Sequence, residues 1–206
     1  MNENTQWLVP LTGVGFVLVG IVSFIVGGEP KSADDPVKEI VSFYVDNKSS
    51  VQAGAIIGVL ATVLLVFFGA YLRGFLRSAA GEGEILSLVA FVGLAIVGVG
   101  FAIDSTILIA LTEAADDIDP SAVQALQALW DNDFVPIALG TQLFLWATGI
   151  SVIRSGALPK WLGWVMLLLG VIGFTPLGFV AAIGSAILVL VLSVWLSLRA
   201  RRPVAA

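Results

Sequence analysis

Hydrophobic positions along the chain form long stretches that are separated by short polar segments. A helix needs about 20 apolar residues to cross about 30 Å of hydrocarbon, because each residue adds about 1.5 Å. Stretches near this length predict six transmembrane helices, at residues 8–26, 51–72, 85–111, 135–153, 158–174 and 177–198. The predicted fold class is therefore all-α, a polytopic membrane protein with one transmembrane domain over residues 1–206.

The first stretch has two interpretations, a signal peptide or a retained helix. No Lys or Arg precedes Trp7, the apolar run is long, and no convincing small-residue cleavage site follows it. A signal peptide carries a basic start and a shorter apolar core. The pattern therefore favours a retained transmembrane helix.

The last two predicted spans share one apolar run that is too long for a single crossing. Pro176 and Gly178 divide it, because proline and glycine interrupt helices. The fifth helix is then short. It has to stand nearly upright or leave its outer turn below the membrane surface.

Two polar segments, 27–50 and 113–133, each contain a short amphipathic pattern. Asp35-Pro36 and Asp119-Pro120 predict helix starts, with Asp as the N-cap and Pro as the first helical residue. We expect the two helices on the outer side, the first lying on the membrane surface. The similar spacing of the two segments indicates either a parallel internal repeat or chance recurrence of loop dipeptides.

Composition supports a membrane protein and excludes several kinds of chemistry. Charged residues make up 12% of the chain, against about 25% in soluble domains. The sequence has no Cys and no His, which excludes disulfides, Cys/His zinc sites, His-ligated haem and His-based catalysis. No cofactor is expected, and no phosphate-binding loop or nucleic-acid signature is present.

The distribution of basic residues predicts the orientation. Cytoplasmic loops of membrane proteins are enriched in Lys and Arg. Lys31, Lys38 and Lys48 lie on one predicted side, whereas the other seven lie on the opposite side: Arg73, Arg77, Arg154, Lys160, Arg199, Arg201 and Arg202. We therefore expect a multi-pass protein of the bacterial inner membrane, with both termini in the cytoplasm.

The predicted outer side is strongly acidic. It combines eleven carboxylates with three lysines, a net charge of −8. One interpretation is that these charges only solvate two loops. The other is that they attract cations or a basic partner.

Asp104 is the one carboxylate inside a predicted span. It lies seven residues before the end of its span, and Gln142 lies seven residues after the start of the antiparallel fourth span. The two side chains are therefore expected at a similar depth. We predict a polar intramembrane cluster of Asp104, Gln142, Thr141 and Thr62.

An ionisable residue inside a membrane is by default a candidate functional site. The structural alternative is that Asp104 is hydrated from outside, or neutral and hydrogen-bonded to Gln142. Catalytic and metal sites are not expected, because glycosidase-type chemistry needs two carboxylates and the spans offer one.

The turn between the fourth and fifth spans carries a resemblance. The run from Arg154 to Gly163, RSGALPKWLG, follows and precedes apolar helices. It resembles the C-terminal signature of a domain-of-unknown-function family of small bacterial integral membrane proteins. The match covers about thirty residues of this chain. The resemblance implies about six helices and lends no activity.

The sequence therefore favours a non-enzymatic membrane component, a scaffold or partner subunit. Its expected partners are the lipid bilayer and a second membrane protein or another copy of the chain, and not nucleic acid. The alternative is a small proton- or cation-linked transporter that uses Asp104. A lipid-modifying enzyme is a third and weaker alternative.

Overall fold

The computed structural model describes residues 3–81 and 85–201, with side chains from residue 7 onward. Arg202, one of the seven basic residues of the predicted inner side, lies outside these residues. The described chain consists of helices and turns, without a strand. The elements are η1 (Glu3–Leu11), α1 (Thr12–Gly27), α2 (Val37–Asp46), α3 (Lys48–Ala80), α4 (Ile85–Ala114), α5 (Pro120–Asp131), α6 (Val135–Ser155), α7 (Lys160–Ile172) and α8 (Gly178–Ala200).

Five helical segments are long and apolar enough to span a membrane, so the chain is a multi-pass membrane protein by length and composition. They are Trp7–Gly27, Lys48–Ala80, Ile85–Ala114, Pro120–Ser155 and Gly178–Ala200. The fifth predicted span forms α7, which has 13 residues. This helix covers about 20 Å, about two thirds of the hydrocarbon thickness.

Two helices run beyond the ends that hydropathy predicts. α3 has 33 residues and α4 has 30 residues. At about 1.5 Å per residue they measure about 50 and 45 Å, clearly more than the hydrocarbon layer of about 30 Å. α2 and α5 pack on one end of these two long helices.

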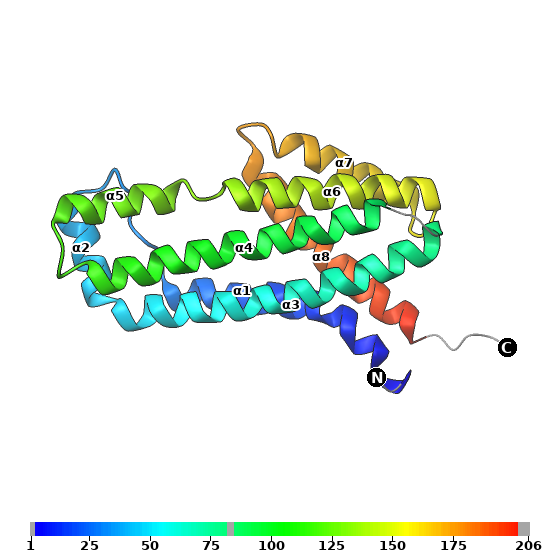
Figure 1. Cartoon of the computed structure of the whole chain (residues 1–206), viewed down its shortest axis with the longest axis horizontal. Helices are drawn as coiled ribbons and strands as arrows, with labels where there is room; N and C mark the ends of the chain where they lie inside the picture. Colours follow the sequence, from blue (N-terminus) through cyan, green and yellow to red (C-terminus); the bar gives the residue numbers. More distant parts are fainter. Residues whose placement is uncertain (1–2, 82–84, 202–206) are drawn as a thin grey trace.

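The helices pack mainly with their neighbours in the chain. α3 packs against α1 and α4, and α6 packs against α4 and α7. α3, α4 and α6 follow the long axis, whereas α8 crosses it obliquely toward the end where η1 lies (Figure 1). α8 thereby contacts both η1 and α1 and joins the end of the chain to its beginning.

Pairs of glycines allow the closest helix contacts. Gly93 on α4 faces Gly140 on α6, and a Cβ added to Gly93 would lie 2.7 Å from the Gly140 carbonyl oxygen. Small residues at such contacts let helix backbones approach each other. The distance and register between α4 and α6 are therefore set by contact of their backbones at Gly93 and Gly140.

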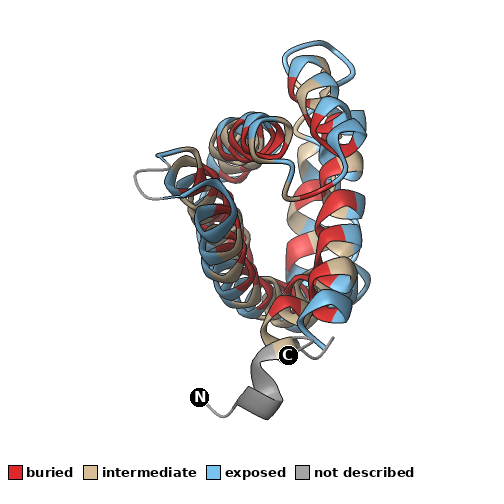
Figure 2. Cartoon of the chain, turned by 90° about the vertical axis from the view of Figure 1, so that its right-hand side faces the viewer, coloured by how far each residue is buried: buried red, intermediate tan, exposed pale blue. Residues whose placement is uncertain are grey.

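Buried residues lie on the sides that the helices turn toward one another, and exposed residues lie outside (Figure 2). The outward side chains of the long helices are nonetheless apolar. Examples with more than half of their surface exposed are Ile25, Leu60, Phe67, Ile183 and Ile187. A surface of this kind suits lipid as its solvent.

The helices α2 and α5 pack on each other and on the protruding ends of α3 and α4. We call this part, with those ends, the helical head. Ile40, Tyr44 and Val123 are fully buried in it. The expectation that the first of these helices rests its apolar side on the membrane is wrong, because that side faces protein. The hydroxyl of Tyr44 also donates a 2.6 Å hydrogen bond to Oε1 of Gln127 on α5.

The two amphipathic helices begin differently. Asp119 caps α5 as predicted, since its Oδ1 accepts the backbone N–H of Ser121 at 2.8 Å. Asp35 does not cap α2, which begins after Pro36. Its Oδ2 instead accepts the backbone N–H of Ser32 and closes a turn before the helix. The predicted N-cap role of Asp35 is therefore wrong.

Candidate functional site: a cavity beside Asp104

Small residues on α3 make room between α1 and α4. Val51, Gly54, Ala55, Gly58 and Ala61 recur every three or four positions, so they share one face of α3. α1 and α4 pack on α3 from either side. Because this face carries little side-chain volume, a trough remains above it.

The trough is a cavity of about 500 Å³. Phe16 of α1 and Phe101 of α4 form one boundary, with ring centroids 6.2 Å apart. Ala186 of α8 and Trp130 of α5 also contribute to the lining. The volume lies within the range of small-molecule sites, about 300–1,000 Å³.

Asp104 is the one charged residue in the described lining of this cavity. It is partly buried on α4, beside the fully apolar side chains of Phe101 and Leu108. The indole of Trp130 lies near the same carboxylate, and its buried Nε1 forms no hydrogen bond among the described residues.

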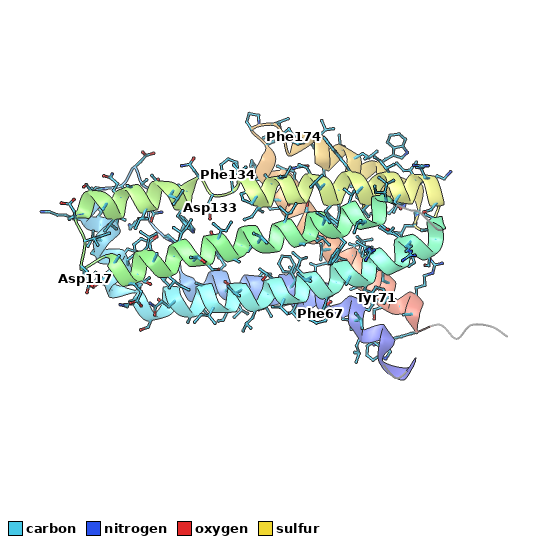
Figure 3. All side chains as sticks on the ribbon, viewed as in Figure 1. Phe67, Tyr71, Asp117, Asp133, Phe134 and Phe174 are labelled. Carbon is cyan, nitrogen blue, oxygen red and sulfur yellow. The ribbon has the colours of Figure 1, made fainter. Side chains whose placement is uncertain are left out.

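A second carboxylate, that of Asp133, lies nearby at the junction of α5 and α6. It is close enough to repel the Asp104 carboxylate. Its side chain lies on the side of the junction that faces α4 (Figure 3). Its Oδ2 is buried without a hydrogen-bond partner. Negative charge from α4 and from the α5–α6 junction therefore collects beside the cavity.

The contacts between α4 and α6 fix which residues share a level. Gly93 faces Phe144, Val97 faces Gly140, and Gly100 faces Ile137. This antiparallel register places Asp104 level with Asp133, and Gln142 level with Ala95. Ala95 lies nine residues from Asp104, which corresponds to about 13 Å along the helix.

Asp104 and Gln142 are therefore not at a similar depth. The estimate from span ends fails because α5 folds back beside the end of α4. Val135, at the start of α6, is therefore level with Ala102 and not with Leu111.

The other predicted cluster residues lie in different places. Gln142 and Thr141 line a second cavity of about 480 Å³, between α6 and the α7–α8 turn. Gln142 packs against Gly173 of this turn, and its Oε1 is buried without a partner. Thr62 faces Gly98 instead, and its hydroxyl donates to the Val59 carbonyl at 2.7 Å. Asp104 is the one predicted residue that lines the first cavity.

Trp130 and Asp133 are the site residues that the sequence analysis missed as such. Both lie in the polar segment 113–133, where the sequence pattern gives no sign of a contact with Asp104. Their positions depend on how α5 folds back along α4, which hydropathy does not encode.

The cavity suits binding better than bond-breaking chemistry. In the described residues no three His, Cys, Asp or Glu side chains gather as a metal-binding group. The described lining supplies one carboxylate, and the Ser23 hydroxyl is engaged with the Gly54 carbonyl at 2.8 Å. The site therefore offers space, aromatic rings and negative charge.

No protein-family model, curated protein or solved structure matches this chain.

Proposed function

We propose that the protein is a non-enzymatic component of the bacterial inner membrane, a scaffold or partner subunit with both termini in the cytoplasm. In this proposal α7, with the turn that follows it, and α8 are the fifth and sixth crossings. Basic residues near η1 and α8 support the orientation. Arg201 stacks 3.6 Å from the ring centre of Trp7, and Arg199 donates to the Ala157 carbonyl at 3.0 Å.

One observation carries the scaffold function, the folded helical head. Its apolar residues are buried against protein, and polar contacts tie its connecting loop to α5. The backbone N–H of Ala33 donates to Asp131 at 2.8 Å, and Gln124 donates to the Ala33 carbonyl at 2.8 Å. An ordered surface outside the hydrocarbon is what a partner protein needs for specific contact.

Site-specific photo-crosslinking in membranes tests this function. A photoreactive residue at Asp117, on the head, is expected to capture a protein in one discrete adduct. The same residue at Leu60, which is 58% exposed on α3, is the control and should capture lipid. A second photoreactive residue is placed at Asp46, at the end of α2. The proposal would be overturned if neither site gave a protein adduct and the protein were a monomer in mild detergent.

A second candidate function is favoured by the position of Asp104 on the cavity wall. A small proton- or cation-linked transporter would use this carboxylate to bind its ion. Proteoliposomes that contain wild-type protein should then show a cation flux that Asp104→Asn abolishes and Asp117→Asn preserves. Equal flux for wild type and Asp104→Asn would exclude this mechanism.

A further inference from the structure

We infer that the cavity beside Asp104 binds a hydrophobic organic cation, a molecule with an apolar body and one positive charge. This inference goes beyond the scaffold function and deepens the transporter alternative by naming the class of ligand. It depends on the cavity and its lining, and not on the orientation of the chain.

The shape of the cavity selects a bulky ligand. A volume of about 500 Å³ is far larger than an inorganic ion needs. The floor of small α3 residues and the Phe16–Phe101 boundary define a trough whose lining is almost entirely apolar. An apolar molecule of drug size fills such a site, and its binding is favoured in proportion to the apolar area that leaves water.

The aromatic residues favour a cation over a neutral molecule. Phe16, Phe24, Phe101 and Trp130 all line the cavity. The faces of aromatic rings carry partial negative charge and attract ammonium or phosphonium groups within about 6 Å. Asp104 lies among them and supplies the full negative charge that a bound cation requires.

Two lysines of the head pair with glutamates and not with Asp104. Lys48 pairs with Glu113 at 3.4 Å, and Lys31 pairs with Glu39 at 3.6 Å. Both pairs lie on the exposed surface of the head. Asp133 adds a second carboxylate that lies outside the lining but close enough to act on Asp104. The field beside the cavity is therefore negative, which favours cations and disfavours anions of the same shape.

An inorganic cation fits the same residues poorly. Hard ions need several oxygen ligands at short distance. The Ser23 hydroxyl already donates to the Gly54 carbonyl, and the rest of the described lining is mostly hydrocarbon. Removing the hydration shell of a small ion here would cost more free energy than its attraction to one or two carboxylates supplies.

The test compares two probes of matched shape and opposite charge. Tetraphenylphosphonium and tetraphenylborate are titrated into purified full-length protein in detergent, and binding is measured by equilibrium dialysis. Wild type is expected to bind tetraphenylphosphonium saturably and tetraphenylborate at least about tenfold more weakly. Asp104→Asn should lower the affinity for tetraphenylphosphonium by about tenfold or more, whereas Asp117→Asn should leave it unchanged.

A cavity-filling variant tests the location independently of charge. Gly20 lines the cavity, and no atom lies within 4 Å of a Cβ added there. The Cβ of Gly20→Leu therefore meets no neighbour, and its longer side chain is expected to occupy the cavity and abolish tetraphenylphosphonium binding. Gly74→Leu is the matched control, since Gly74 also has no neighbour within 4 Å and lies outside the cavity.

Several results would overturn the inference. They are equal binding of the two probes, unchanged binding by Asp104→Asn, and unchanged binding by Gly20→Leu in a protein that keeps its thermal stability. Binding of neutral tetraphenylmethane as tightly as the cation would also overturn it. If the cavity does not bind an organic cation, the scaffold function is unaffected, because crosslinking through the head does not involve the cavity.

Discussion

Gly54 of α3 and Gly27 of α1 lie so close that a methyl group on Gly54 would come within 2.6 Å of the Gly27 Cα. The Ser23 hydroxyl strengthens the same contact by donating to the Gly54 carbonyl at 2.8 Å. The methyl group of Gly54→Ala would meet backbone atoms, which cannot rotate away. We expect this substitution to lower the free energy of unfolding in detergent by about 1–3 kcal/mol.

Gly74→Ala is the matched control for that substitution. Gly74 lies on the same helix, and no atom approaches its added Cβ within 4 Å. Alanine favours helix by up to about 1 kcal/mol over glycine, so stability should stay equal or rise slightly. An equal loss of stability in both variants would show that the α1–α3 contact is not as close as described.

Tyr44→Phe tests the interior of the head. The change removes the donor of the 2.6 Å hydrogen bond and leaves the buried Oε1 of Gln127 unpaired. We expect a loss of about 1–3 kcal/mol in unfolding free energy. Tyr71→Phe, the same change at a half-buried position of α3 outside the head, should cost less. Equal effects of the two changes would argue against a folded head.

Alkaline pH provides a second test of Tyr44. Burial, followed by the charges of Asp131 and Asp104, raises the pKa of the Tyr44 hydroxyl above its ordinary value of 10.0. The folded state therefore keeps the proton after the unfolded state has lost it. Stability is fully retained below about pH 10 and falls as the pH rises above it.

Thermal unfolding between pH 8 and pH 11, about one unit or more on either side of the ordinary tyrosine pKa, measures this loss. Tyr44→Phe should be less stable than wild type at pH 8 but should lose less on going to pH 11. Parallel curves for the two proteins would contradict the burial of the Tyr44 hydroxyl.

Asp104 and Gln142 should act independently. They lie about 13 Å apart along the helix axes and line different cavities. In a double-mutant cycle of Asp104→Asn and Gln142→Met, the unfolding free energies should add to within about 0.5 kcal/mol. A larger coupling energy would instead support the single polar cluster that the sequence predicts.

The absence of cysteine makes the proposed orientation testable by labelling. Asp117→Cys lies in the exposed α4–α5 turn, and Arg77→Cys lies on the exposed last turn of α3. A membrane-impermeant maleimide should label the first in intact spheroplasts and the second only after permeabilisation. The reverse pattern would place the termini outside the cytoplasm.

Hydropathy predicted the helical architecture because lipid requires long apolar segments with satisfied backbones. It located the break at Pro176 and Gly178, and the capped start of α5 at Asp119. It failed at the ends of α3 and α4, where polar residues continue the helix beyond the apolar stretch. Helix length there depends on packing against α2 and α5, which is a tertiary effect.

The candidate site could likewise be predicted only in part from the sequence. Asp104 stood out in the sequence because a carboxylate is costly in an apolar span. Its neighbours could not be found in this way, because the register between α4 and α6 depends on where Gly93 and Gly140 interlock. A distance of about two and a half helical turns separates Asp104 from Gln142, whereas Asp104 lies near Asp133 and Trp130.

The unbroken course of α3 has a mechanical consequence. The helix runs from Lys48 in the head to Ala80 at the opposite end, and its sequence contains no proline. A helix without proline lacks the commonest cause of a sharp kink. A tilt of the head can therefore be carried along α3 to its opposite end, past the cavity floor at Gly54 and Gly58.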